Sequence, residues 1–178
     1  MNSQHNDAVE ALAQHIVERL AENGLTLATA ESCTGGALAC AFAATPGSGE
    51  IFQGGFVCYS KRAKERALGV SPVLLSEDTA VSRSVVEAMA RGARERMDCD
   101  FAVAITGVTG PEPDDDGNPV GLVHSAVAAR AGNLDHLEQR LEGAAPETLR
   151  EEAILEALRL LKAALDRRSL VPRADEDG

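Results

Sequence analysis

The 178-residue sequence has no tryptophan and one tyrosine, and aromatic residues make up only 3% of it. Positive charge is also scarce, because the formal net charge is -11 at pH 7 and acidic residues are spread along the whole chain. Such a charge distribution repels phosphate backbones and anionic lipid surfaces. We therefore expect no nucleic acid and no membrane among the partners of this protein.

Cysteine is scarce as well, and its spacing shows no pattern. The cysteines Cys33, Cys40, Cys58 and Cys99 form no C-x-x-C pair of the kind found in zinc and redox sites. No segment approaches the roughly 20 apolar residues of a membrane span. The N-terminus carries Asp7 and Glu10 where a signal peptide needs positive charge. These features predict a cytoplasmic protein whose thiols fill space in the core.

Helical and strand-like patterns alternate along the chain, of which 44% is hydrophobic. Apolar periodicity and turn residues predict helices at about 6–22, 35–44, 61–68, 72–76, 83–97 and 146–166, and strands at about 25–30, 51–59, 101–105, 120–129 and 134–141. The last two strands are expected to form a hairpin. The order predicts an α/β fold, a three-layer α/β/α arrangement with a mixed, mostly parallel sheet.

One domain is expected over residues 1–168, followed by a disordered charged tail at 169–178. Open α/β sheets bind ligands at the carboxyl ends of their strands. In this chain those ends are the loops after Ala30, Tyr59 and Ile105. The residues most able to carry chemistry lie in these three loops.

Ser32 lies where the first strand passes into a helix, in the segment Glu31–Gly36. Backbone N–H groups and the positive end of a helix dipole favour an anion at such a turn. The anion would be a phosphate or the oxyanion of a tetrahedral intermediate, with the hydroxyl as the attacking group. The common alternative is that Ser32 or Thr34 only caps the helix.

A serine nucleophile needs a base, and the histidines do not provide one. His5, His15, His124 and His136 all lie outside the promising loops, and their spacing predicts no metal site. Lys64 offers another base, since a partly desolvated lysine near other cations loses proton affinity. Tyr59 could relay the proton or orient the lysine. The alternative is an ordinary aromatic residue at a strand end followed by a solvated helix start.

Two more segments attract attention. Thr106–Pro111 follows a buried strand, and its glycines would let a ligand approach the backbone closely, although a plain turn is the simpler interpretation. The run Asp114–Asp116 could bind a hard cation but is more typical of a solvated loop tip.

Taken in order, these motifs resemble the CinA C-terminal-domain family. The matching segments are residues 29–36, 46–48, 55–60, 63–64, 68–70, 80–82, 102–111 and 119–121. Characterised members of the family hydrolyse the carboxamide of nicotinamide mononucleotide. The resemblance implies a single amidohydrolase domain that uses no cofactor, binds a pyridine mononucleotide and forms a homo-oligomer.

The family's active-site serine, tyrosine and lysine correspond to Ser32, Tyr59 and Lys64. The resemblance implies that Lys64, assisted by Tyr59, deprotonates Ser32, which attacks the carboxamide and releases ammonia before water cleaves the acyl-enzyme. Cys33 is expected to be a packing residue. The residues expected at the substrate are Glu31, Thr34, Gly35, Gly36, Thr106, Gly107, Gly110 and Arg150. Among them, Thr34 and the N–H groups of Gly35 and Gly36 would bind the oxyanion or the phosphate.

The sequence departs from the family pattern in two places. Glu112–Asp116 is acidic where the family usually has more glycines, and Gly143–Pro146 lacks an arginine, which leaves Arg150 as a candidate phosphate ligand. Larger relatives have an N-terminal domain for which we expect no room here. Two other functions stay open: a nucleotide-binding or regulatory module without turnover, and an amidase for another small carboxamide.

Overall fold

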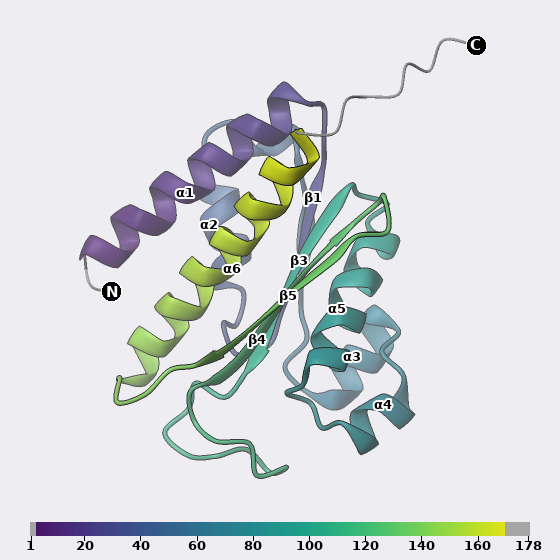
Figure 1. Cartoon of the computed structure of the whole chain (residues 1–178), viewed down its shortest axis with the longest axis vertical. Helices are drawn as coiled ribbons and strands as arrows, with labels where there is room; N and C mark the ends of the chain where they lie inside the picture. The colour runs from purple at the N-terminus through teal and green to yellow at the C-terminus, as the bar shows by residue number, and fades with distance from the viewer. Residues whose placement is uncertain (1–2, 170–178) are drawn as a thin grey trace.

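The computed structural model describes residues 3–169, and within this range five strands form one sheet with helices on both faces (Figure 1). The strands are β1 (Leu27–Glu31), β2 (Phe52–Val57), β3 (Phe101–Gly107), β4 (Leu122–Ala129) and β5 (Leu134–Arg140). The helices are α1 (Ser3–Glu22), α2 (Ala37–Ala44), α3 (Lys61–Leu68), α4 (Pro72–Glu77), α5 (Arg83–Arg96) and α6 (Pro146–Ser169), with a short 3₁₀-helix η1 at Ser48–Glu50. The expected three-layer α/β/α fold is confirmed.

The strand order in the sheet is β2-β1-β3-β4-β5. β1 lies between β2 and β3 and pairs with both in parallel, so the carboxyl ends of these three strands meet at one edge of the sheet. The segments that follow them are the turn at Ser32, the start of α3 and the loop 108–121. The topology therefore brings the three loops selected from the sequence to the same end of the molecule.

The sheet is less parallel than expected. β3 pairs with β4 in antiparallel fashion, and so does β4 with β5, so parallel and antiparallel pairings are equal in number within the described sheet. A mixed sheet was expected and is observed, but the expectation that most pairings would be parallel was wrong. The cause is the connection after β3, which contains no helix. A parallel neighbour needs a crossover connection, whereas a plain loop returns the chain in the opposite direction.

Side-chain size differs between the two faces of the central strands. Phe101, Val103 and Ile105 of β3 point toward the layer of α1, α2 and α6. Ala102 and Ala104 alternate with them and point toward the layer of α3, α4 and α5. Because alanine occupies little space, α5 packs closely on this second face, and Figure 1 shows it running along the sheet beside β3 and β4.

The helix and strand boundaries expected from the sequence agree with the structure to within a few residues. α1 begins at Ser3, before its expected start, and α6 continues to Ser169 and so includes the first residue of the expected tail. The remainder of that tail, residues 170–178, lies outside the described residues. No helix in residues 3–169 combines the length and the apolar character needed to cross a bilayer.

Gly92 provides a test of the close packing of α5. A Cβ atom at this position would lie 2.0 Å from the backbone oxygen of Leu68, at the end of α3. Glycine-to-alanine exchange in a helix normally stabilises by about 1 kcal/mol, but here we expect Gly92→Ala to lower the free energy of unfolding by about 1–3 kcal/mol because the helices must separate. Urea unfolding measures this change.

Gly49→Ala is the matched control, since a Cβ atom there meets nothing within 4 Å. We expect it to leave the unfolding midpoint nearly unchanged. A Gly92→Ala protein as stable as the parent would show that α3 and α5 are not in this close contact.

Candidate active site

The turn after β1 is organised by a buried carboxylate. The Glu31 side chain is fully buried, and its oxygens accept hydrogen bonds from the N–H groups of Gly36, Leu38 and Ala39 at 3.1, 2.9 and 2.8 Å. The Thr34 hydroxyl donates to the same carboxylate at 2.7 Å. The positive end of α2 is therefore occupied by a carboxylate of the protein itself.

This arrangement determines what the predicted binding residues can do. The N–H group of Gly36 donates to Glu31, and the N–H group of Gly35 donates to the Ser32 carbonyl at 3.1 Å. Glu31, Thr34, Gly35 and Gly36 do not line the cleft that Ser32 faces. In the structure these residues fix the shape of the turn, and their contact with an oxyanion or phosphate stays a prediction.

Ser32 and Lys64 meet in the interior. The Lys64 Nζ lies 2.8 Å from the Ser32 Oγ and 3.2 Å from the Cys58 carbonyl oxygen. Only 1% of Lys64 and 6% of Ser32 is exposed to solvent. Burial lowers the pKa of Lys64 to about 8, because an ammonium group loses hydration inside the protein. A lysine with this pKa can exist as the neutral amine near physiological pH and accept the proton of a hydroxyl group.

The position of Lys64 depends on how α3 is anchored. Ser60 precedes the helix and accepts a hydrogen bond from the Ala63 N–H group, which caps its start. Gly69 ends the helix in the left-handed conformation at φ 73°. Lys64 and Leu68 are its buried residues and share one face at i, i+4 spacing. The sequence KRAKERAL thus forms a charged helix that turns one lysine inward.

Tyr59 and Cys33 lie near the pair and line the same cleft. Tyr59 is 77% exposed, and no hydrogen bond joins its hydroxyl to Ser32 or Lys64 within residues 3–169. Its assistance to Lys64 stays a prediction. Burial raises the pKa of the Cys33 thiol to about 12, so the thiol is uncharged at neutral pH and a poor nucleophile.

The glycine-containing segment after β3 forms the opposite wall. Gly107 and Gly110 line the cleft, and Thr106 does not, since its hydroxyl donates to the Ala80 carbonyl at 2.9 Å. A Cβ atom at Gly107 would lie 2.8 Å from the Leu122 oxygen, which explains the glycine there. Thr109 donates to the Cys33 carbonyl at 3.4 Å and so connects this wall to the Ser32 turn.

The acidic loop 108–121 closes the cleft on its outer side. Lys61 and Asp116 form an ion pair, with the Lys61 Nζ 2.7 Å from Asp116 Oδ1. This contact lowers the pKa of Asp116. Asp114 accepts hydrogen bonds from the N–H groups of Asp116 and Asn118 at 3.1 and 2.8 Å. The loop is therefore folded on itself and fastened to the start of α3.

Several candidates lie elsewhere. Arg150 is on α6, pairs with Glu147 at 3.4 Å and does not line the cleft, but its charge acts on the Cys33 thiol, which does; its contact with a phosphate stays a prediction. His124 and His136 contact each other at 3.0 Å on β4 and β5, where burial lowers the pKa of both imidazoles. In the described part of the chain, no group of three or more histidine, cysteine or acidic side chains is arranged to hold a metal ion.

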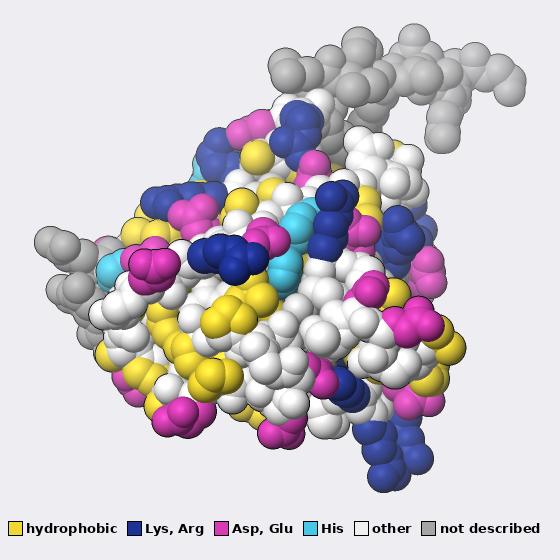
Figure 2. Space-filling model, turned by 60° about the horizontal axis from the view of Figure 1, so that its bottom comes forward, with side chains coloured by type: hydrophobic (Ala, Val, Ile, Leu, Met, Phe, Trp, Pro, Cys, Tyr) yellow, Lys and Arg dark blue, Asp and Glu magenta, His cyan; other side chains and the backbone are white. Residues whose placement is uncertain are grey.

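The cleft itself has a volume of about 570 Å³ and lies at the carboxyl ends of the parallel strands. It is lined by Ser32, Cys33, Tyr59, Ser60, Lys61, Lys64, Ala80, Val81, Gly107, Val108, Thr109, Gly110, Glu112, Pro113, Asp114, Asp115 and Asp116. Figure 2, which brings the bottom of the molecule forward, shows acidic side chains at several places around the margin of that face. A larger and mostly apolar groove of about 690 Å³ lies between α1, α2 and α6.

Two parts of this cleft were not predicted as site residues from the sequence. The segment Ala80–Val81, just before α5, contributes to its wall, and the Lys61–Asp116 pair lies at its mouth. The clustering of Lys61 with other basic residues and the acidic run at 114–116 were visible in the sequence. Their pairing was not, because 55 residues separate the two side chains.

The fold and the site define a class of protein: an α/β domain that presents a buried serine–lysine pair where parallel strands end. The family model described as the CinA C-terminal domain matches residues 9–165. The chain therefore belongs to the CinA C-terminal domain family.

The chain is similar to curated proteins and to solved structures. It is 50% identical over 123 residues to a CinA-like protein of Synechococcus sp. strain CC9902, covering 69% of this chain and 29% of that protein. It is 47% identical over 121 residues to the nicotinamide-nucleotide amidohydrolase PncC of Shewanella oneidensis, covering 68% and 28%. The chain thus spans less than a third of the length of these two relatives.

Among solved structures, the competence/damage inducible protein CihA of Agrobacterium tumefaciens superimposes with a TM-score of 0.85 at 41% identity, covering 89% of this chain and 96% of that one. A CinA superfamily protein of Escherichia coli gives a TM-score of 0.84 at 38% identity, covering 88% and 90%.

The pKa of Lys64 has a consequence for stability. The amine has a pKa of about 8 in the folded protein against an ordinary value of 10.5, so between these pH values the unfolded chain binds more protons. The cost of burying the charge is complete below pH 8 and disappears as the pH rises toward 10.5. By linkage, a pKa difference of this size amounts to roughly 3–4 kcal/mol.

We therefore expect Lys64→Met to stabilise the protein more, relative to the parent, at pH 7.5 than at pH 10. Urea unfolding at both pH values measures the difference. Lys162→Met, which changes a lysine on the surface of α6, is the matched control and should show a much smaller pH effect. An equal effect of Lys64→Met at both pH values would contradict a buried amine with a lowered pKa.

Proposed function

We propose that this chain is an amidohydrolase that converts nicotinamide mononucleotide and water to nicotinate mononucleotide and ammonia. The observation that supports it is the 2.8 Å hydrogen bond between the Lys64 Nζ and the Ser32 Oγ in a cleft at the carboxyl edge of the sheet. The name of the Shewanella oneidensis relative gives the chemical class of the substrate.

In the first half of the reaction, the neutral Lys64 amine accepts the Ser32 proton as the oxygen attacks the carboxamide carbon. The tetrahedral intermediate then collapses, and Lys64 returns the proton to the leaving nitrogen, which departs as ammonia. The product is an ester between Ser32 and the pyridine carboxyl group. With a pKa of about 8, roughly a tenth of the amine is neutral at pH 7, far more than for an ordinary lysine.

In the second half, Lys64 accepts a proton from water as the water oxygen attacks the ester carbonyl. Collapse of this intermediate releases the carboxylate and returns the proton to Ser32. Because the N–H groups of Gly35 and Gly36 are engaged within the turn, the oxyanion has to meet other donors that line the cleft. The backbone at Thr109 and Gly110, on the opposite wall, is the best candidate. Tyr59, at the rim of the cleft, is proposed to contact the pyridine ring or to assist proton transfer.

The nucleophile is tested by measuring ammonia release from nicotinamide mononucleotide. We expect Ser32→Ala to lower kcat by about a thousandfold or more, as for other enzymes that lose the attacking group. Ser76→Ala is the matched control, because that hydroxyl lies on the surface of α4 and donates to the Val73 carbonyl. Turnover that survives in the Ser32→Ala protein would exclude Ser32 as the nucleophile. Binding without turnover in the parent protein would favour a regulatory module.

The base is tested by the pH dependence of the same reaction. Because only the neutral amine accepts a proton, we expect kcat/KM to rise about tenfold per pH unit below pH 8 and to level off above it. Measurements from pH 6.5 to 9.5 cover this range. A profile that is flat or that falls with increasing pH would contradict the role of Lys64.

A further inference from the structure

The Asp116 carboxylate lies between two hydrogen-bond donors at the mouth of the Ser32 cleft. Its Oδ1 accepts a hydrogen bond from the Lys61 ammonium group at 2.7 Å, and its Oδ2 accepts one from the Ala80 N–H group at 3.2 Å. Lys61, Ala80 and Asp116 all line the cleft, although they come from α3, the segment before α5 and the loop 108–121. An ammonium group and a backbone N–H group that converge on one anion are also donors that proteins use to hold a phosphate. The fold thus forms an anion site here, and a side chain of the protein occupies it.

Asp116 can leave this position while the loop keeps its shape. The side chains of Lys61 and Asp116 are 44% and 24% exposed, so water reaches both, and exposed ion pairs contribute little to stability. The loop has other attachments. Asp114 accepts hydrogen bonds from the N–H groups of Asp116 and Asn118, and the Asn118 amide also donates to the Thr79 hydroxyl at 3.2 Å. A rotation of the Asp116 side chain is therefore enough to free both donors.

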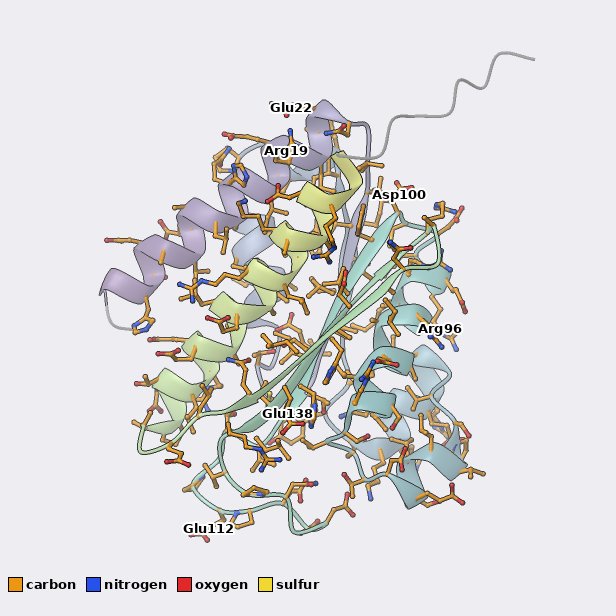
Figure 3. All side chains as sticks on the ribbon, in the orientation of Figure 1. Arg19, Glu22, Arg96, Asp100, Glu112 and Glu138 are labelled. Carbon is orange, nitrogen blue, oxygen red and sulfur yellow. The ribbon has the colours of Figure 1, made fainter. Side chains whose placement is uncertain are left out.

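The mouth of the cleft is otherwise acidic. Four carboxyl groups of the loop 108–121 line it, those of Glu112, Asp114, Asp115 and Asp116. Figure 3 shows Glu112 on this loop, at the end of the molecule opposite Glu22 and Asp100. Carboxylates repel an anionic group, so such a group binds where a cation offsets them. Among the residues that line the cleft, the exposed lysine is Lys61.

Lys61 and Lys64 are placed for different parts of a mononucleotide. They lie three residues apart on α3, so their Cβ atoms are about 5–6 Å apart. Lys64 turns inward and contacts Ser32, where the carboxamide reacts in the proposed mechanism. Lys61 lies at the mouth. The phosphate of a mononucleotide is attached on the far side of the ribose from the pyridine ring. With the carboxamide at Ser32, the phosphate therefore extends toward the mouth.

The opposite wall supplies donors for the reacting end of the substrate. Thr109 and Gly110 line the cleft, and their N–H groups form no backbone hydrogen bond within residues 3–169. In the proposed reaction these groups meet the oxyanion that develops next to Ser32. The phosphate then needs donors of its own, and Lys61 and Ala80 provide them.

We propose that the Lys61 ammonium group and the Ala80 N–H group bind the phosphate of the mononucleotide, and that the Asp116 carboxylate is a built-in competitor that the phosphate displaces. The inference rests on the proposed function and locates one part of its substrate. A phosphate monoester carries about 1.5 to 2 negative charges at pH 7, more than a carboxylate, so Lys61 attracts it more strongly. No covalent bond changes in this exchange, and Asp116 turns toward the solvent. The competition raises the KM for the mononucleotide.

The test compares the KM for nicotinamide mononucleotide with the KM for nicotinamide riboside, which lacks the phosphate, by ammonia release at pH 8. Asp116→Asn removes the competing charge, so the KM for the mononucleotide should fall about threefold, the effect of one exposed ion pair. Lys61→Gln removes the cation, so the same KM should rise about tenfold, as for the loss of one hydrogen bond to a charged group. The KM for the riboside should change by less than about twofold in both proteins.

Asp115→Asn is the matched control. It removes an equal charge from the adjacent residue, whose carboxyl group also lines the cleft but is not the partner of Lys61. We expect it to lower the KM for the mononucleotide less than Asp116→Asn does. An equal fall in the two proteins would show that only the total charge of the loop matters, and would overturn the displacement of Asp116.

A Lys61→Gln protein that keeps the parent's KM for the mononucleotide would overturn the phosphate site, and so would an equal rise for the riboside. If the parent releases ammonia from neither compound, the proposed function is wrong, and calorimetry decides the phosphate site alone. The mononucleotide should then bind more weakly to a Ser32→Ala, Lys61→Gln double variant than to the Ser32→Ala protein. Equal binding would contradict the site.

Discussion

The hydrogen bond between the Lys64 amine and the Ser32 hydroxyl is the interaction on which any chemistry at this site depends. It requires that a lysine be taken out of water, and the surrounding structure is arranged to do so. Alanines on β1 and β3 let the layer of α3, α4 and α5 lie close to the sheet, and Gly92 lets α5 lie close to the end of α3. α3 is packed in this layer, and its buried Lys64 side chain points toward the turn after β1. Packing on one face of the sheet thus places the Lys64 amine beside the Ser32 hydroxyl.

Glu31 fixes the turn that carries Ser32. A helix start attracts anions, and α2 begins close to Ser32. Because the Glu31 carboxylate accepts three backbone N–H groups and the Thr34 hydroxyl, that attraction is satisfied within the protein. The turn is held firmly, and the serine remains directed at the cleft. The proposed reaction then relies on the amine of Lys64 and on donors from the opposite wall.

Much of this could be predicted from the sequence. Apolar periodicity located the helices and strands, and the rule that ligands bind where strands end selected the three loops that form the cleft. The inward orientation of Lys64 follows from its spacing with Leu68, although a helix with so many charges looks solvated when considered alone. The hairpin of β4 and β5 was predicted from the sequence. The antiparallel pairing of β3 with β4 was not, because it depends on the connection after β3.

Other features could not be predicted because they depend on contacts between distant segments. Glu31, which was expected at the substrate, caps α2 in the structure, and its contact with a substrate stays a prediction. A carboxyl group three residues before Thr34 was a signal for capping, but the family motif made ligand binding the more attractive interpretation. Lys61 and Asp116 come together only when the loop after β3 folds back over α3. Arg150 was selected for its position in the sequence; it lies on α6 outside the lining of the cleft, near enough for its charge to act on Cys33, and its role stays a prediction.

The loop 108–121 contains neither Ser32 nor Lys64, and besides its own hydrogen bonds it is held by the Lys61–Asp116 ion pair and by hydrogen bonds to other segments. Its exposed carboxyl groups at Glu112 and Asp115 set the charge of the cleft without contacting Ser32 or Lys64. The charge of the cleft and the contact between Ser32 and Lys64 are thus determined by different segments of the chain, so the first can be altered experimentally while both residues of the second are kept.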